Sequence, residues 1–512
     1  MYFKILNNNR SNILLLIALF AFNDLFYAER FGLNILIFLL LIFTFQVVLF
    51  KESFQNRKVL LGVGLTIFTA AMLVWHNSLL SKWMFFLSYT ITLGFIIQPK
   101  LRFIGYSILT TASNYLRLPF EIFTWNKTDS ISEKRGFKFT RAFLLSIIPV
   151  IIGLIFYIIY RVANPIFAEL TDKFWIKIGD WIENVFKHIS MVRILFILFG
   201  VVILSGIIYT RNASFFANEE EQFTDTIERK RDKVRLPFLS SGFMNEYLSG
   251  IILLVIMNLM LLVLNAIDIK YIWINFEIPS GVSLSEMVHQ GTEWLIVSII
   301  LSIVVVIYLF RANQNFYSKS KWLKLLAYAW MAQNIILTVS LLMRNNMYVS
   351  WHALAYKRLG VYVFIALTFI GLVTMLIKIN KAKSFFYLLR INAWAAYLIM
   401  CGVCCINWDI FIAKYNVEFE KGSQLDTDFL LKLSPKAYPY IYDKLDKVGT
   451  QIKAHENNSE IRGLYYYNAE QFRDQLDHLS RIYIAENSDK TWRSYNVADH
   501  YALEYLKTKI IP

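Results

Sequence analysis

The sequence predicts an all-α, polytopic membrane protein with about eleven transmembrane helices and a small helical extracytoplasmic domain at its C-terminus. Long apolar runs without Asp, Glu, Lys or Arg recur along the 512 residues. Hydrophobic residues make up 57% of the chain and charged residues only 17%, whereas soluble domains carry about 25% charged residues. Basic residues gather in alternate connections between the runs, as expected of cytoplasmic loops. These three observations together exclude an ordinary soluble protein.

Each run matches the length of a helix that crosses a membrane. A hydrocarbon core about 30 Å thick requires roughly 20 helical residues, and backbone in lipid must satisfy its own hydrogen bonds. We therefore predict a transmembrane bundle over residues 1–408. The predicted spans are 12–28, 31–50, 58–76, 80–98, 141–161, 191–210, 247–267, 292–310, 323–343, 357–378 and 385–407. No small-residue cleavage site follows the first run, so we interpret it as a retained helix.

The stretch Phe103–Leu116 is apolar but has only about 14 residues, which is short for a crossing. We expect an interfacial or re-entrant segment there. If it crossed the membrane, every later loop would change sides, and the basic cluster at Arg229–Arg235 would lie outside. The positive-inside rule therefore favours eleven spans, with the N-terminus inside and the C-terminus outside. The same rule explains the net charge of +15, so we expect no nucleic-acid partner.

An amphipathic helix is predicted over residues 164–190, between the fifth and sixth spans. Asn164 followed by Pro165 is typical of a helix start. Apolar residues then recur at steps of three or four: Phe167, Leu170, Phe174, Ile178, Trp181, Val185 and Ile189. Two placements remain open: in the outer headgroup layer, with Trp175 and Trp181 as anchors, or packed on the protein's own outer surface.

Residues 409–512 are polar and charged, and we expect them to form a soluble helical domain outside the membrane. Ser434–Pro435 indicates one helix start. Asn468 precedes a helical stripe of apolar residues: Phe472, Leu476, Leu479 and Ile482. Asn496 is predicted to cap a last helix that carries Val497, Tyr501 and Tyr505.

Two sets of residues are candidates for binding. Asn258, Gln333 and Asn334 are central polar residues of predicted spans, and they either line a cavity or form hydrogen bonds between helices. Arg344, Tyr348 and Arg358 fall on the predicted outer connection between the spans at 323–343 and 357–378. They either contact an anion, such as a lipid phosphate or a carboxylate, or extend toward the headgroups without specific binding.

We predict no catalytic residue, metal or cofactor. The seven histidines show no i, i+4 pair, and Cys401, Cys404 and Cys405 lie in an apolar run, where we expect them to pack as small hydrophobic residues. Phosphate-binding, serine-hydrolase and zinc-protease motifs are missing. Loop carboxylates remain as candidates for a transferase: Asp268, Glu277 and Glu286.

Several short motifs together resemble an uncharacterised family of bacterial multi-pass inner-membrane proteins that share a domain of unknown function. The motifs are Asn23–Asp24, Asn164–Phe167, Ser283–Glu286, Arg344 with Tyr348 and Arg358, Asn407–Asp409, Asp426–Ser434 and Thr491–Asn496. The family pattern has Gly-Leu-Thr where this chain has Ala353-Leu354-Ala355. The resemblance implies a plasma-membrane protein with a helical extracytoplasmic tail and no assigned reaction. Some relatives carry a carotene monooxygenase label, but the histidine-rich iron site of such an enzyme is not apparent in this sequence.

Three functions follow as hypotheses. The first is a non-enzymatic scaffold or accessory protein of the bacterial envelope, embedded in the lipid bilayer and binding envelope proteins through its tail. The second is a transporter of a polar or amphipathic solute. The third is a membrane-embedded transferase that acts on a lipid-linked substrate.

Overall fold

The computed structural model describes residues 9–122, 149, 152–185, 190–209, 214–227, 243–274, 284–310, 316–317, 320–419, 425–456 and 467–510. Within these ranges the protein is helical, and its only extended pairing is an isolated β-bridge between Thr226 and Lys383. The start of the predicted span 141–161, the end of the predicted helix 164–190, and Glu277 lie outside the described residues.

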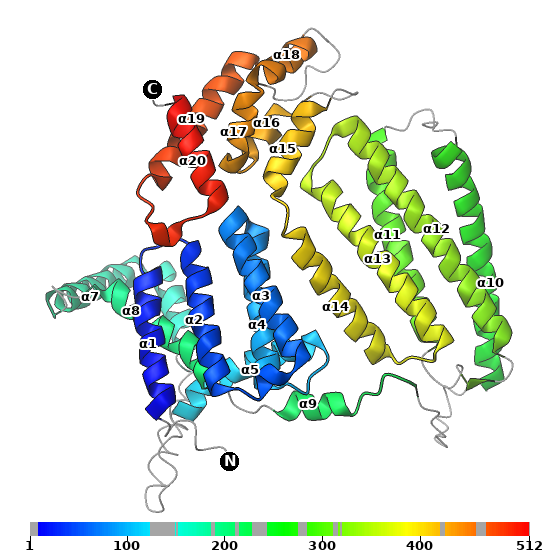
Figure 1. Cartoon of the computed structure of the whole chain (residues 1–512), viewed down its shortest axis with the longest axis horizontal. Coiled ribbons are helices and arrows are strands. Elements are labelled where there is room, and N and C mark those ends of the chain that lie inside the picture. The colour runs from blue at the N-terminus through cyan, green and yellow to red at the C-terminus, as the bar shows by residue number, and fades with distance from the viewer. Residues whose placement is uncertain are drawn as a thin grey trace, which may run out of the picture.

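Two groups of helices stand side by side (Figure 1). The first group packs mainly through neighbouring pairs, α1 with α8, α3 with α4 and α4 with α5. Its helices are α1 (Asn9–Phe26), α2 (Leu33–Leu49), α3 (Arg57–His76), α4 (Leu79–Ile97), α5 (Ile104–Ile122) and α8 (Met191–Ile208). Backbones touch where α4 meets α5, since a Cβ atom at Gly94 would lie 2.1 Å from the Ser107 carbonyl oxygen.

The second group is built around α12, which packs against α10, α11 and α13. Its helices are α10 (Phe243–Asp268), the π-helical segment η2 (Ile269–Ile274), α11 (Leu284–Leu309), α12 (Lys321–His352) and α13 (Tyr356–Asn380). Helix α14 (Phe385–Val403) packs on both α13 and α5, and so joins the groups. The short α9 (Ser214–Glu221) lies at the end of the bundle opposite the C-terminal domain (Figure 1).

Seven of the described helices are long and apolar enough to cross a membrane. They are Arg57–His76, Leu79–Ile97, Met191–Ile208, Asn245–Ile274, Lys321–His352, Tyr356–Asn380 and Phe385–Val403. Three further apolar helices are shorter: Leu33–Leu49, Ile152–Ala163 and Glu293–Leu309. A helix occupies the described part of every predicted span, whereas the full count of eleven and the orientation stay predictions.

Helix α5 lies at the segment expected at 103–116 but continues to Ile122, and it packs against α4 and α8. It is not among the described helices that are long and apolar enough to cross a membrane, and whether it is interfacial or re-entrant stays a prediction. Polar side chains lower the hydropathy of this helix, and the sequence therefore predicts a shorter segment than the structure contains. Ser107 and Thr111 donate hydrogen bonds to the carbonyl groups of Ile91 (2.6 Å) and Thr90 (2.8 Å) on α4, and Asn114 donates to Gly206 on α8 (2.7 Å). These groups are buried against neighbouring helices, where their hydrogen bonds compensate for lost hydration.

Helix α7 (Pro165–Val185) projects away from the bundle (Figure 1). It contacts the preceding helix Ile152–Ala163, through an ion pair of Arg161 with Asp172 (2.6 Å) and a hydrogen bond from Trp175 to Tyr157 (2.9 Å). Apolar side chains along its described part are largely exposed: Ile166, Leu170, Phe174, Trp175 and Ile176. This exposure favours the headgroup layer over packing on the protein's own surface.

The C-terminal domain has its own hydrophobic core and covers one end of the bundle (Figure 1). Its elements are α15 (Trp408–Glu418), α16 (Thr427–Lys432), η4 (Pro435–Ala437), α17 (Tyr438–Asp443), α18 (Leu445–Glu456), α19 (Ala469–Asn487), η6 (Trp492–Ser494) and α20 (Val497–Ile510). Asn468 caps α19 with Gln471 in a capping box, and Phe472 is buried in the core. Asn496 directly precedes α20, as predicted, and its carbonyl accepts from the N–H of His500 (2.9 Å). Its side chain does not cap the helix, because its Oδ1 accepts no hydrogen bond from any described residue and its amide group donates to Phe31 and Ser494.

Candidate functional site

The C-terminal domain is attached to the connection between α1 and α2 by hydrogen bonds between residues about 460 positions apart. Thr491 and Ser494 donate to the two carboxylate oxygens of Glu29 (2.7 and 2.6 Å). The backbone N–H of Arg30 donates to Ser494 (2.8 Å), and its guanidinium donates to Asn487 (2.9 Å). The η6 segment is thereby fixed against the first helical hairpin.

Gly32 allows η6 to approach this hairpin closely. A Cβ atom at Gly32 would lie 2.5 Å from the carbonyl carbon of Ser494 and 2.7 Å from the oxygen of Tyr495. The next residue completes the contact, since the N–H of Leu33 donates to that Tyr495 oxygen (3.0 Å). The buried Asn34 side chain holds the hairpin by donating to the carbonyls of Leu25 and Arg30.

A second attachment is a buried charged cluster at the end of α3. Asp499 pairs with Lys436 (3.5 Å) and Lys490 (3.1 Å), and it accepts a hydrogen bond from Asn77 (2.6 Å). Asn77 ends α3 in the left-handed conformation (φ 46°), which Asn tolerates well, and its carbonyl accepts from Lys436 (2.7 Å). The end of α3 is thus joined by hydrogen bonds to a charged cluster of the C-terminal domain.

Burial and charge act in opposite directions on the pKa values of this cluster. Burial raises the pKa of the Asp499 carboxyl, but Lys436, Lys490 and the Asn77 hydrogen bond outweigh it and hold that pKa below its usual value. Burial lowers the pKa of Lys436, which Asp499 offsets only in part. Removing one member of such a cluster would leave an uncompensated buried charge.

The third attachment joins the C-terminal domain to the second helix group. The side chain of Asn416 accepts from the N–H of Leu354 (2.8 Å) and donates to its carbonyl (3.0 Å). Asp409 accepts from both Tyr356 and the backbone N–H of Ser434. The domain therefore contacts both helix groups at the same end of the bundle.

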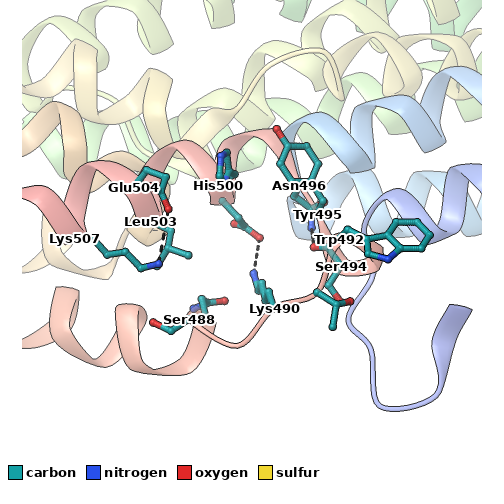
Figure 2. Close-up of a pocket in the computed structure, with 13 residues that line it drawn as sticks. Ser488, Lys490, Trp492, Ser494, Tyr495, Asn496, His500, Leu503, Glu504 and Lys507 are labelled. Carbon is teal, nitrogen blue, oxygen red and sulfur yellow. Dashed lines mark hydrogen bonds and ion pairs between the residues drawn. The ribbon is translucent and has the colours of Figure 1, made fainter.

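A pocket of about 300 Å³ opens between η6 and α20 (Figure 2). Polar side chains from the end of α19 and from η6 form one part of its wall, and Trp492, Tyr495 and His500 contribute aromatic rings. The lining residues are Asn487, Ser488, Lys490, Thr491, Trp492, Ser494, Tyr495, Asn496, Asp499, His500, Leu503, Glu504 and Lys507. Sequence reasoning missed this pocket, although Thr491–Asn496 was one of the motifs of the resemblance.

Two of the three predicted central amides, Asn258 and Gln333, link α10 and α12. Gln333 donates to the Asn258 side chain (2.8 Å), and Asn258 donates to the carbonyls of Leu254 (2.7 Å) and Leu326 (3.1 Å). Asn334 is fully buried and donates to Trp330 within its own helix (2.8 Å). These contacts hold the two helices together, which is a common role of amides in membrane bundles.

An ion pair that the sequence did not predict lies between the same helices. Arg344 donates to Asp268 (2.7 Å), and both side chains are nearly inaccessible to solvent. Asp268 is the last residue of α10 before the π-helical segment, and Trp273 in that segment donates to Ser340 on α12 (3.0 Å). The heptad spacing of Asn258 and Asn265, with Asp268 three residues later, was the available signal that these residues share one face.

Arg344 and Tyr348 lie on the last turns of α12, which continues to His352, rather than on a connection as expected. The guanidinium of Arg358 lies 4.3 Å from the centre of the Tyr348 ring and donates to the carbonyls of His352 and Ala353. These contacts close the turn between α12 and α13. An anion-binding role for the three residues stays a prediction.

The described part of the chain holds no group of three or more His, Cys, Asp or Glu residues that could bind a metal ion. Cys401 and Cys404 are buried in the apolar contacts of α14, and Cys405 is exposed.

A family model described as "Domain of unknown function (DUF4153)" matches residues 58–444, about three quarters of the chain. No curated protein and no solved structure matches the chain.

Proposed function

The chain belongs to the DUF4153 family, whose domain is of unknown function, and we propose that it is a non-enzymatic scaffold or accessory protein of the bacterial envelope. In this proposal the bundle spans the plasma membrane with the N-terminus inside, and the C-terminal domain projects outside as a platform for envelope proteins. Basic residues in alternate connections support this orientation.

The attachment of the C-terminal domain is the observation that carries the proposal. Buried charges at Asp499 and hydrogen bonds to Glu29 and Leu354 fix the domain to both helix groups. A domain held in this way keeps one orientation relative to the membrane. Partner proteins would therefore meet its exposed face in a fixed position, as a scaffold requires.

Photo-crosslinking in intact cells tests this function. A photoreactive amino acid at position 501 replaces an exposed aromatic residue of α20, and the same amino acid at position 20 probes a lipid-facing site on α1. We expect a discrete protein adduct from position 501 that disappears when Gly32→Ala displaces the domain. The proposal fails if position 501 gives no adduct beyond those from position 20.

Topology is tested separately in a variant without Cys401, Cys404 and Cys405. Tyr501→Cys should react with a membrane-impermeant thiol reagent in intact cells, whereas a protected cysteine would place the domain inside. An inside location would overturn the envelope role even if the domain still bound a partner.

A transporter is the second candidate, and the buried polar side chains of α10 and α12 favour it. One side-chain oxygen each of Asn265, Asp268, Gln333 and Asn334 is buried and has no hydrogen-bond partner among the described residues. Ionisable groups inside a bundle often mark ion or substrate paths. In a cysteine-free background, labelling of Asn334→Cys from outside would indicate a water-filled path, with His352→Cys as the positive control. The scaffold predicts no labelling at position 334.

A further inference from the structure

The pocket between η6 and α20 has the lining of a binding site for an uncharged polar ligand. Its charged residues neutralise one another, because Lys490 pairs with Asp499 (3.1 Å) and Lys507 with Glu504 (3.7 Å), as the dashed lines in Figure 2 show. An anion such as phosphate would have to compete with these carboxylates. The charge balance therefore argues against a phosphate site.

One buried acceptor in the lining has no partner. Asn496 is only 2% exposed, and its amide nitrogen donates to Phe31 and Ser494, but its Oδ1 accepts no hydrogen bond from any described residue. Leaving a buried acceptor unpaired costs free energy. This oxygen is covered by the protein itself, so a ligand in the pocket would meet the exposed hydroxyl groups of Ser488 and Thr491 instead.

The remaining lining supplies apolar surface beside hydrogen-bonding groups. The indole of Trp492 is 59% exposed at the rim, and the rings of Tyr495 and His500 lie with their centres 5.2 Å apart. Ser488 and Thr491 add hydroxyl groups. Sugars present the matching surfaces, with hydroxyl groups at their edges and apolar C–H groups on the faces of the ring.

We propose that this pocket binds a neutral saccharide unit, with Trp492 against the face of the sugar ring and the hydroxyl groups of Ser488 and Thr491 accepting hydrogen bonds from the sugar. The saccharide comes either from a free glycan or from the headgroup of a glycolipid, since both offer this chemistry. The inference goes beyond the proposed function and uses it only to place the pocket outside the cell.

Binding is tested on the full chain in phosphatidylcholine nanodiscs, so that no sugar-headed detergent is present. The probes are maltose and diacetylchitobiose, observed by saturation-transfer NMR. We expect at least one of them to bind. Trp492→Ala should weaken binding about tenfold or more, because it removes the stacking surface. Tyr501→Ala, which removes an equally exposed aromatic residue outside the pocket lining, should leave binding unchanged.

Adding digalactosyldiacylglycerol to the nanodiscs distinguishes the two sources. Loss of the disaccharide signals would assign the pocket to a glycolipid headgroup, whereas retained signals would assign it to a free glycan. The proposal is overturned if neither disaccharide binds, if Trp492→Ala and Tyr501→Ala bind equally, or if inorganic phosphate displaces the sugar. Crosslinking at position 501 reports on partner proteins independently, so the two proposals can fail separately.

Discussion

At the scale of single residues, the backbone at Ala353 is the clearest case of strain. Ala353 ends α12 with φ 60° and ψ −167°, a region that is nearly exclusive to glycine. The family pattern that the chain resembles has glycine at this place. Hydrogen bonds keep the backbone in this strained conformation. The carbonyl of Ala353 accepts from Arg358, and the N–H of Leu354 donates to Asn416.

We expect Ala353→Gly to stabilise the protein by about 1 kcal/mol, because relief of roughly 1–3 kcal/mol of strain exceeds the greater entropy of glycine in the unfolded chain. Thermal unfolding of the purified protein measures the effect. Ala355→Gly is the matched control, because Ala355 has φ −144° and glycine there brings only the entropic loss. A lower melting temperature for Ala353→Gly would contradict the prediction.

Asp499 should make the stability depend on pH. Its pKa in the folded protein lies below the value in the unfolded chain, so its contribution is present above about pH 4 and is lost as the pH falls through the folded-state pKa. We expect Asp499→Asn to cost about 3 kcal/mol at pH 7, because Lys436 and Lys490 keep buried charges without a counterion.

Thermal unfolding of both proteins between pH 7 and pH 3 checks this expectation. The difference between wild type and Asp499→Asn should stay constant down to about pH 4 and narrow below it, when the wild-type carboxyl also becomes neutral. A gap that is the same at pH 3 as at pH 7 would show that Asp499 acts through its shape and not its charge.

At the scale of elements, the contact between η6 and the first hairpin depends on a missing side chain. Gly32→Ala should weaken the attachment of the C-terminal domain, because the new methyl group would overlap the backbone of Ser494 and Tyr495. We expect a loss of about 1–3 kcal/mol and faster hydrogen exchange in η6. Gly64→Ala on α3 is the control, since nothing lies within 4 Å of its added methyl group; equal effects of the two substitutions would refute the steric argument.

The ion pair between α10 and α12 gives a second prediction at this scale. Asp268→Asn should destabilise the bundle by about 3–5 kcal/mol, because Arg344 would keep a buried charge without a counterion. The double variant Asp268→Leu, Arg344→Met should recover much of this loss, since it removes both charges. Chemical unfolding measures the stability. If a transport activity is found, its loss in a stably folded double variant would assign the pair to function.

The length of the charge-free apolar runs was sufficient to predict the long helices, because a helix in lipid satisfies its own backbone hydrogen bonds and can be recognised without its packing partners. The same criterion did not predict the full length of α5. Burying Ser107 and Asn114 in a membrane protein is unfavourable unless they form hydrogen bonds, and here they donate to carbonyl groups of α4 and α8. The Asp499 cluster was missed for a related reason, because Asn77 lies 422 positions before Asp499 and no local pattern records such a contact. The pocket lies within residues 487–507, but its shape depends on how η6 and α20 fold back on each other, which apolar patterning does not reveal.

At the scale of the whole molecule, the two helix groups are connected at both ends. The C-terminal domain connects them at one end. At the other end Asp225 pairs with Arg390 on α14 (2.6 Å) and Arg102 before α5 (3.6 Å), and Ser384 donates to the Asp225 carbonyl. The groups are thereby restrained from moving apart, which fits a scaffold better than a carrier that rocks between two states.

Asp225→Asn should lower the free energy of unfolding by about 2 kcal/mol, because the guanidinium groups of Arg390 and Arg102 lose their negatively charged partner. Hydrogen exchange in the first turn of α14 should accelerate. Glu221→Gln removes the exposed pair with Lys100 and should change stability by less than about 0.5 kcal/mol. Unchanged exchange in Asp225→Asn would mean that the groups do not depend on this cluster.

The hydrogen bonds between residues 29–34 and 487–496 also set an order of events during biosynthesis. The ribosome synthesises the hairpin residues Glu29, Arg30 and Leu33 long before it synthesises their hydrogen-bond partners. These partners are Thr491, Ser494 and Tyr495. The first hairpin therefore stays without these hydrogen bonds until almost the last residue is synthesised. A polypeptide that stops short of residue 490 would keep the turn of this hairpin exposed, and the cell's proteases could recognise it as unfinished.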